Sequence, residues 1–474
     1  MIDISDFKSA ERVFYFFEEI SKIPHGSGNT AKIADYLVAF ADERGLEVKR
    51  DSADNVIIKK GATEGYETRP TVILQGHTDM VLAQTSESKI NMETDGLELY
   101  RDGDFLRAVG TTLGGDDGVA VAYALALLDS SDLHHPPIEA LFTTDEEVGL
   151  DGAKAIDPAC IDGRIMINID SDEEGVFTVG CAGGVRVDIA KTVRRSKAKL
   201  PSYKIVLDNL KGGHSGVEIN AGRENAIRLL AEAVSAVFDV RLFDLFGGNA
   251  DNAIPRYAEC TAYTSLDKDA LEERLWSVLT KYKVSEPDMT LTVTEDGGRV
   301  GFFTENDTRA LLVMILKMPN GVVKMSEDVK WLVDTSLNLG VISTEGDAVT
   351  LSFSIRSASG ERKRELERRV LRVAGEFGAT ARCHSDYPAW EYRKDSALRE
   401  VMCDVYRKKY GKEPKVIIIH AGLECGIFSD KLDGLDCVSI GPDNFDIHTP
   451  EEHLSISSTA RVWEYLLDVL REIK

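Results

Sequence analysis

The pattern of hydrophobic and polar positions divides the chain into three stretches, of which the first runs to about residue 185. There, segments with apolar residues at helical spacing alternate with short runs rich in β-branched residues. Helices are predicted at 7–22, 29–44 and 116–128, and strands at 55–59, 71–75, 138–142 and 164–169. Residues 80–113 are expected to form a long loop. This alternation predicts a three-layer α/β/α sandwich with a mostly parallel or mixed sheet.

The pattern changes near Gly183, where runs that alternate apolar and polar residues begin. Half-buried strands are predicted at 185–193, 203–207, 290–294 and 349–355, with helices at 223–238 and 360–377. After Pro388 the α/β pattern returns, with helices at 395–409, from 422 and at 457–473, and strands at 415–419 and 435–440. The simplest topology is an α/β domain formed by residues 1–186 and 385–474. It is interrupted at 187–384 by an α+β domain with an open antiparallel sheet.

Composition and charge narrow the classes of partner. The chain has 474 residues with 56 Lys plus Arg and 80 Asp plus Glu, a formal charge of −24. Such a charge argues against nucleic acid and anionic membrane surfaces as partners. The longest purely apolar run, Val119–Leu128, is far short of the roughly 20 residues that a membrane span needs. Seven scattered cysteines without a C-x-x-C pair, and no leader-like pattern at the start, favour a reduced, cytoplasmic protein.

Five groups of acidic residues or histidines stand at the ends of predicted strands or open a predicted helix. They are His77 with Asp79, Asp116 with Asp117, Glu146 with Glu147, Asp170, and His448. In open α/β sheets, ligands bind outside the carboxyl ends of the strands, so this shared placement is informative. Each group alone also fits an ordinary role, such as a strand-end turn, a helix cap or a solvated acidic turn.

Together, the five groups supply the donors that a pair of metal ions needs. A histidine binds zinc through one ring nitrogen, and an acceptor such as Asp79 orients the ring through the other. Two adjacent carboxylates repel each other unless a cation is present, and the pair lets one bind metal while the other takes a proton from metal-bound water. Two histidines and three ligating carboxylates suffice for two zinc ions that share one carboxylate and one water. The neighbouring Asp116 and Asp117 leave open which of them is the ligand.

The order of these motifs resembles that of the dinuclear zinc exopeptidases, which include aminoacylases, glutamate-type carboxypeptidases and carnosinase-like dipeptidases. Within this family, the chain is similar to the aminoacyl-histidine (Xaa-His) dipeptidases of bacteria. The branch resemblance rests on the segments Lys211–Gly216, Asn252–Arg256, Ser354–Ser357 and His420–Gly426, and the similarity covers nearly the full chain. One departure is visible, because the branch more often has Asp-Asn where this chain has Asp116-Asp117.

The resemblance implies a role for each metal ligand. His77 and Asp170 would hold one zinc ion, Glu147 and His448 would hold the other, and Asp116 would bridge the pair. The implied cofactors are therefore two Zn²⁺ ions, although Mn²⁺ or Co²⁺ could occupy similar nitrogen and oxygen ligands.

The resemblance also assigns the proton chemistry, and it makes the inserted domain a lid. Glu146 would act as general base and then as general acid for a water shared by the two ions. Asp79 would orient the histidine ligand two residues before it. His214, in the lid, would donate to the tetrahedral oxyanion, either within the chain or from a partner subunit.

Three further side chains are candidate substrate contacts. Arg356 ends a predicted strand, and its fork suits the α-carboxylate that an exopeptidase must recognise, although an edge-strand arginine is an equally ordinary interpretation. Asn252 is a further polar contact candidate. Glu424 could pair with a free amino group, but a glutamate at a helix start is also common.

The leading hypothesis is a cytoplasmic dizinc dipeptidase that cleaves small peptides, with Xaa-His dipeptides of the carnosine type as substrates. Within the same chemistry, the alternative is a broader di- or tripeptidase or an N-acyl amino acid deacylase. The alternative of a different class is an inactive metal-binding scaffold, against which the retained Glu146 argues. A lid of this size is compatible with a monomer and with a homodimer.

Overall fold

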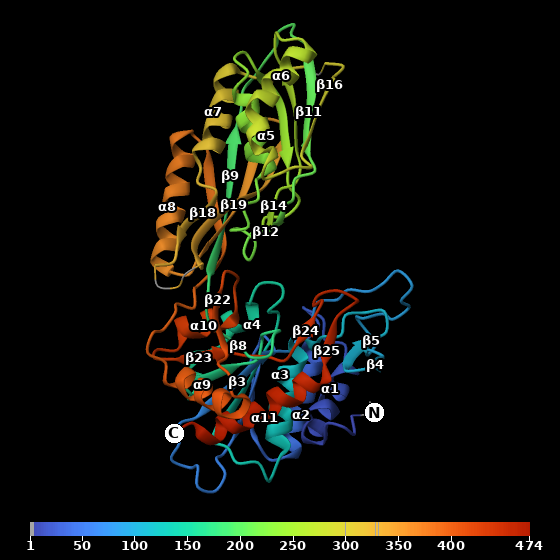
Figure 1. The fold of residues 1–474 in the computed structure, drawn as a ribbon, viewed down its shortest axis with the longest axis vertical. Coiled ribbons are helices and arrows are strands. Elements are labelled where there is room, and N and C mark those ends of the chain that lie inside the picture. The colour runs from blue at the N-terminus through green and yellow to red at the C-terminus, as the bar shows by residue number, and fades with distance from the viewer. Residues whose placement is uncertain (1–3, 299, 328, 330) are drawn as a thin grey trace. The chain divides into compact units, whose positions relative to one another are not determined.

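The computed structural model describes residues 4–298, 300–327, 329 and 331–474. Residues 1–3 lie outside the described residues. They belong to the N-terminal segment for which the sequence predicts no leader. Contacts divide the chain into two compact units, drawn in Figure 1. The first unit comprises residues up to 180, 392–418 and 423–474, and the second comprises residues 181–391 and 419–422. The domain limits placed at 186/187 and 384/385 from the sequence stay a prediction.

The first unit is built on an eight-stranded sheet with the order β1-β2-β6-β3-β7-β23-β8-β22. Its strands are β1 (Glu47–Arg50), β2 (Val56–Lys60), β3 (Val72–His77), β6 (Ile138–Thr143), β7 (Ile165–Asn168), β8 (Val176–Cys181), β22 (Lys415–Ile419) and β23 (Asp436–Ser439). The central strands β6, β3, β7 and β23 are parallel to one another, whereas β1, β2 and β8 pair antiparallel. β3 and β6 are buried along their whole length, as parallel strands covered on both faces are.

Helices cover both faces of this sheet. They are α1 (Glu11–Ser21), α2 (Ala31–Glu43), α3 (Gly115–Asp129), α4 (Asp151–Ala155), α9 (Ala397–Tyr410), α10 (Glu424–Lys431) and α11 (Ile456–Glu472), with 3-10 turns η1 (Lys8–Ala10) and η2 (Pro158–Cys160). Val72 and Leu74 of β3 pack into the main core with α1, α2, α3, α9 and α11. α10 contacts β23 and α4, and Figure 1 shows α4 and α10 on the other side of the sheet from α9 and α11. α3 is apolar all round because it is buried all round.

The prediction of a plain loop at 80–113 was wrong. This stretch contains the hairpin β4 (Leu99–Asp102) and β5 (Phe105–Ala108), which joins β24 (Asn444–Phe445) and β25 (His453–Ser455) in a four-stranded sheet. Strands of two to four residues are too short to give a clear alternation, and their partners lie over 300 residues away in the chain. The hairpin supports the β24–β25 loop, which carries His448.

The second unit contains a nine-stranded, antiparallel sheet with the order β16-β11-β15-β13-β19-β20-β9-β21, and β18 pairs with β19. Its strands are β9 (Gly183–Thr192), β11 (Ser202–Asp208), β13 (Arg241–Gly247), β15 (Ala258–Tyr263), β16 (Thr290–Glu295), β18 (Gly321–Met325), β19 (Val333–Glu345), β20 (Ala348–Ser357) and β21 (Thr380–Tyr387). The short pairs are β10 (Arg195–Ser196) with β17 (Phe302–Phe303) and β12 (Gly213–His214) with β14 (Ala253–Ile254).

Four helices share one core with the second unit's sheet. They are α5 (Ala226–Ser235), α6 (Lys268–Leu279), α7 (Glu305–Lys317) and α8 (Gly360–Glu376), and η3 (Thr280–Lys283) follows α6. The sequence pattern did not reveal β19, because its first eight residues are all buried and include polar ones, so they do not alternate. The predicted fold class, an α/β/α domain with an inserted α+β domain, is confirmed.

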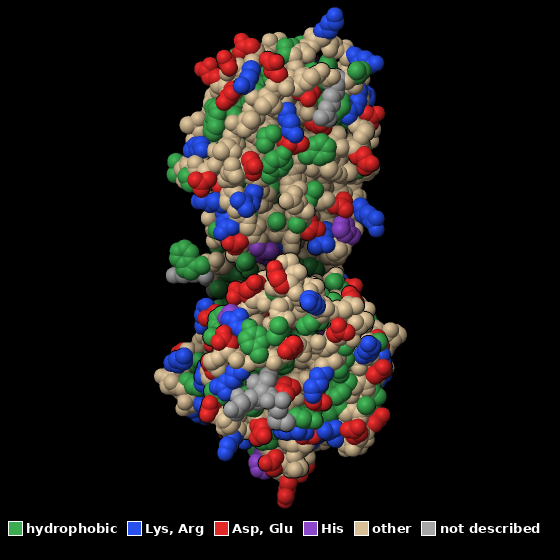
Figure 2. All heavy atoms as spheres, turned by 90° about the vertical axis from the view of Figure 1, so that its right-hand side faces the viewer, with side chains coloured by type: hydrophobic (Ala, Val, Ile, Leu, Met, Phe, Trp, Pro, Cys, Tyr) green, Lys and Arg blue, Asp and Glu red, His purple; other side chains and the backbone are tan. Residues whose placement is uncertain are grey.

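Two features concern the classes of partner considered from the sequence: the distribution of surface charge, and the length and apolarity of the helices. On the face seen in Figure 2, acidic and basic side chains are interspersed over each unit. The acidic excess is therefore spread over this face as ordinary surface charge. No helix in the described ranges is long and apolar enough to cross a membrane.

Candidate metal centre and substrate-binding residues

The predicted metal ligands meet at one edge of the first unit's sheet. β3 lies between β6 and β7 and is parallel to both, so the three strands end at the same edge. His77 ends β3, Glu146 and Glu147 lie in the turn after β6, and Asp170 lies two residues beyond β7. Asp116 arrives from the first turn of α3, and His448 arrives from the β24–β25 loop. The fold thus brings together residues from five separate segments of the chain.

Asp116 stands between the two histidines. Its Oδ1 lies 3.1 Å from His77 Nε2, and its Oδ2 lies 3.1 Å from His448 Nε2. Possible ligand atoms of Asp116, His77 and Asp170 lie within 4.8 Å of one another, and so do those of Asp116, Glu147 and His448. The two groups share only Asp116, and a carboxylate can bridge two cations through its two oxygens.

Asp117 has a different environment. It is buried, and its Oδ2 accepts a hydrogen bond from the backbone N–H of His77 at 3.1 Å. A Cβ on Gly76 would lie 2.5 Å from this oxygen, so only glycine leaves room for it. Burial raises the pKa of Asp117 well above its usual range. Asp116 therefore faces the imidazole rings and Asp117 faces the strand backbone. The peptide bond between them is cis.

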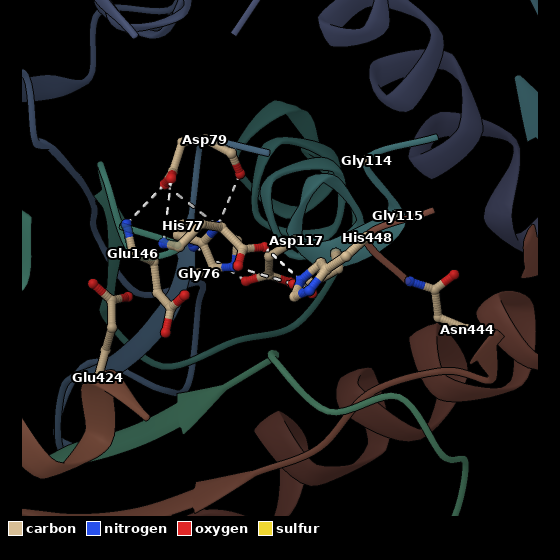
Figure 3. A network of polar contacts seen from close by, with 12 residues as sticks. Gly76, His77, Asp79, Gly114, Gly115, Asp117, Glu146, Glu424, Asn444 and His448 are labelled. Carbon is tan, nitrogen blue, oxygen red and sulfur yellow. Dashed lines mark hydrogen bonds and ion pairs between the residues drawn. The ribbon is translucent and has the colours of Figure 1, made fainter. Parts of the chain in front are cut away.

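Asp79 links the segment of His77 to the segment of Glu146 through hydrogen bonds, as Figure 3 shows. Nδ1 of His77 lies 2.9 Å from the Asp79 backbone carbonyl and 3.5 Å from its Oδ1. The Asp79 carboxylate also accepts from the Ser27 hydroxyl at 2.8 Å and from the backbone N–H groups of Glu146 and Glu147 at 3.0 and 3.4 Å. With Nδ1 held by acceptors, Nε2 of His77 is the nitrogen that points to the carboxylate cluster.

The candidate ligand atoms have the surroundings expected of a site for divalent cations. Oδ2 of Asp170 is buried and has no hydrogen-bond partner among the described residues, and burial raises the pKa of this carboxyl well above its usual range. Oε1 of Glu147 lies 2.8 Å from His448 Nε2 without a well-oriented hydrogen bond. Buried acceptors that converge without donors are costly, and a cation between them removes that cost. In the metal-free protein, the contacts with Asp116 and Glu147 raise the pKa of His448 to about 10.

Glu146 lies beside this cluster and keeps a proton more tightly than an ordinary glutamate. Burial raises its pKa to about 8, and the nearby carboxylates of Glu424 and Glu147 add to the shift. Its carboxylate also falls within 4.8 Å of ligand atoms of His77 and Glu147. A carboxylate with a pKa near neutrality, next to possible cation sites, is suited to accept and return a proton.

Glu424, the first residue of α10, is fully buried in the first unit. Its Oε2 accepts from the Thr143 hydroxyl at 2.6 Å and from the Gln75 amide at 2.5 Å, while Oε1 has no partner in the described part of the chain. Burial raises its pKa to about 7. Figure 3 shows its carboxylate beside that of Glu146. The sequence reasoning missed Gln75 and Thr143, and the signal for them was their position, two residues before the end of β3 and at the end of β6.

The second unit gathers two histidines and an arginine. A Cβ on Gly216 would come within 2.7 Å of the His420 carbonyl and 2.8 Å of the His214 ring, so the two segments meet there. Burial, and then the positive charge of Arg356, lowers the pKa of both imidazoles, that of His420 to about 4. Nε2 of His420 lies 2.7 Å from Ser336 Oγ, and its buried Nδ1 has no hydrogen-bond partner among the described residues.

Arg356 and Asn252 belong to the same unit. The Arg356 side chain is buried, its Nη1 donates to Tyr387 Oη at 3.2 Å, and its Nε has no partner within the described ranges. The backbone carbonyl of Asn252 accepts from Ser215, next to His214, at 2.8 Å. Three of the predicted substrate contacts thus lie in the second unit and one, Glu424, in the first. His420 was not selected from the sequence, although, like His77, it follows an apolar strand.

Comparisons with known proteins agree with this organisation. The chain is 35% identical over 483 residues to the cytosol non-specific dipeptidase of Escherichia coli strain K12, covering 98% of each chain. It matches the crystal structure of aminoacylhistidine dipeptidase from Vibrio alginolyticus with a TM-score of 0.91 and 35% identity, covering 99% of each chain. Aminopeptidase PepT from Bacillus cereus, at 17% identity and a TM-score of 0.57 over 98% of each chain, shares the fold. The model of peptidase family M20/M25/M40 matches residues 73–472, and the chain belongs to this family.

Proposed function

We propose that this peptidase is a dinuclear metal dipeptidase that hydrolyses Xaa-His and other dipeptides in the cytoplasm. The observation that carries the proposal is the pair of ligand groups that share only Asp116, with Glu146 beside them. The relatives from Escherichia coli and Vibrio alginolyticus, both named as dipeptidases and both 35% identical to this chain, support the substrate class. Seven cysteines that form no disulfide among the described residues, and the name of the cytosolic relative, support the compartment.

In this proposal, His77 and Asp170 would hold one Zn²⁺ ion, Glu147 and His448 would hold the other, and Asp116 would be shared by both. Mixed nitrogen and oxygen donors suit zinc and also accept Mn²⁺ or Co²⁺. When bound, the two cations supply Lewis acidity, which polarises a scissile carbonyl and makes water a better nucleophile at neutral pH.

The proton transfers fall to Glu146. Its carboxylate takes a proton from the attacking water and returns it to the nitrogen of the departing amine. The raised pKa in the metal-free protein supports this role, because a base poised near neutrality can also serve as the acid. Asp79 holds the backbone N–H of Glu146, and so positions the base relative to His77.

Recognition of the peptide falls largely to the second unit. Arg356 pairs with the α-carboxylate of the substrate, and His214 donates to the oxyanion of the tetrahedral intermediate. Asn252 adds a polar contact. Glu424, in the first unit, receives the free amino group through Oε1, which has no hydrogen-bond partner among the described residues.

A panel assay tests the proposal. Purified protein, stripped with a chelator and reloaded with Zn²⁺, Mn²⁺ or Co²⁺, is offered an Xaa-His dipeptide, other dipeptides, a tripeptide and an N-acetyl amino acid. We expect cleavage of dipeptides that the chelator abolishes and metal restores, with the tripeptide and the acetylated substrate cut far more slowly. Faster cleavage of the acetylated substrate would identify a deacylase, and no turnover of any substrate would identify a scaffold.

A further inference from the structure

A buried carboxylate, with no lysine or arginine bonded to it in the described part of the chain, lies behind the segment that carries Asp116. Glu452 is 2% exposed and follows His448 by four residues on the β24–β25 loop. Among the described residues, its polar contacts are backbone N–H groups and the amide of Asn444 rather than a lysine or arginine. A charge in such a place is costly unless its hydrogen bonds serve a purpose.

The two oxygens of Glu452 accept from four consecutive backbone N–H groups at the start of α3. Oε2 accepts from Leu113 at 2.8 Å and Gly114 at 2.9 Å, and Oε1 accepts from Gly115 at 2.8 Å and Asp116 at 3.3 Å. The start of a helix has unpaired N–H groups and a positive dipole end, so a carboxylate there is well stabilised. The turn needs glycine, because Gly114 has a φ of 69°.

The same side chain links two segments that carry proposed metal ligands. Glu452 lies on the loop that carries His448, and the last of the four backbone N–H groups that it accepts from belongs to Asp116. The residues after it form β25, which pairs with β5 and β24 and fixes the loop on its other side. His77 and Asp170, by contrast, are placed by β3 and β7, which do not depend on Glu452.

We propose that Glu452 is a positioning residue that fixes the Asp116 carboxylate relative to His448, and so sets the affinity for the cation that these two residues share. This inference rests on the proposed dinuclear centre. Hydrogen-bond partners behind metal ligands typically change metal affinity by about 10–100-fold when they are replaced. We expect the loss to fall on the ion held by Glu147 and His448 more than on the ion held by His77 and Asp170.

The test is a Zn²⁺ titration of the metal-free, full-length protein against a competing chelator. Glu452→Gln keeps the side-chain shape, but its NH₂ group faces two of the four backbone N–H groups and leaves them unpaired. We expect two bound ions in the wild type and a dissociation constant about 10–100-fold higher for one of them in the variant, with a smaller rise for the other because both share Asp116. Glu451→Gln is the matched control, because it makes the same charge change at the adjacent, exposed residue.

The outcomes separate this inference from the proposed function. A wild type that binds fewer than two ions contradicts the dinuclear centre itself. A folded Glu452→Gln protein that binds both ions as the wild type does, or that loses both equally, overturns only the positioning role. So does an equal loss in Glu451→Gln. If circular dichroism shows that Glu452→Gln does not fold, Glu452→Asp takes its place. Its shorter carboxylate is expected to weaken the binding of the same ion most, and wild-type dissociation constants in it overturn the inference.

Discussion

The candidate sites of the two units differ in their charge, because the first unit gathers carboxylates and the second holds the Arg356 guanidinium beside two neutral imidazoles. In the first unit, buried carboxylates converge, and burial raises the pKa of Glu146 to about 8 and that of Glu424 to about 7. In the second unit, burial and Arg356 lower the pKa of His214 and His420. Each cluster is costly without a ligand. In the first unit, neighbouring carboxylates repel one another, and in the second unit, buried Arg356 Nε has no acceptor among the described residues.

The difference indicates what each unit is built to receive. A cluster of acids with converging oxygens is suited to cations, and a buried guanidinium beside imidazoles is suited to an anionic group. A dipeptide requires both, since its scissile carbonyl needs activation and its α-carboxylate needs a cationic partner. We therefore expect substitution of Glu146 in the first unit to lower kcat and substitution of Arg356 in the second unit to raise KM.

Glu146→Gln tests the first half of this comparison and should have the largest effect. The amide cannot take a proton, so kcat should fall by roughly 10²–10⁴-fold while two metal ions stay bound. Steady-state kinetics on a dipeptide, with metal content measured on the same sample, check this. Glu173→Gln, which changes an exposed carboxylate of the same unit, is the control. A variant that keeps more than a tenth of the wild-type kcat would remove Glu146 from the proton transfer.

Arg356→Lys tests the second half. Lysine keeps the charge but loses the two-pronged geometry, so KM for a dipeptide should rise by about 10–100-fold, the equivalent of one charged hydrogen bond. The comparison substrate is the same dipeptide with an amidated C-terminus, which lacks the carboxylate. Wild type and variant should cleave the amide with similar efficiency. An equal loss on both substrates would mean that Arg356 supports the fold of β20 and does not read the carboxylate.

The sequence could predict that His77 and Asp170 lie at one edge of the first unit's sheet, because each follows a strong signal. His77 and Asp170 each follow a run of apolar residues, and parallel strands end at one edge, so the placement of these two residues follows from the fold class alone. Which of the two neighbouring aspartates faces the imidazoles could not be predicted in the same way. That depends on the Asp117 hydrogen bond to the backbone of β3, which is a tertiary contact.

The sequence carries no such signal for a side chain that accepts hydrogen bonds from backbone groups far away in the chain. Glu452 is one of 80 acidic residues, and only the fold shows that its carboxylate accepts from N–H groups more than 330 positions earlier. The β4–β5 hairpin was missed for a related reason, because its partner strand comes from the other end of the chain. In both cases the information lies in pairings between the two sequence segments of the first unit.

The pH dependence of stability sharpens the contrast between the units. Glu146 and Glu424 have folded-state pKa values of about 8 and about 7, against an ordinary value of 4.5. A raised pKa means that the folded state holds the proton more tightly, so this stabilisation is complete below pH 4.5 and is lost as the pH rises through 7 and 8. The Tm of the metal-free protein, followed by circular dichroism, should therefore fall between pH 5 and pH 9.

Zn²⁺ loading should reduce this fall, because cations favour the ionised carboxylates. Glu424→Gln removes one of the two groups, so the fall in Tm of the metal-free variant should be smaller than in the wild type. A Tm that stays level or rises from pH 5 to pH 9 in the metal-free wild type would contradict the proposed origin of the carboxylate shifts.

Ser336→Ala should give the smallest effect and probes the second unit alone. The Ser336 hydroxyl contacts His420 Nε2 at 2.7 Å in a buried setting, and removing one such hydrogen bond is worth about 1 kcal/mol, or roughly fivefold. If His420 contributes to substrate binding together with Arg356, KM rises by about that factor while kcat is unchanged. Ser343→Ala, on the same strand β19, removes a hydroxyl that bonds Thr350 Oγ1 at 2.7 Å in an exposed setting, and should leave KM unchanged. If Ser336→Ala lowers kcat and leaves KM as it is, the division of chemistry and recognition between the two units fails at His420.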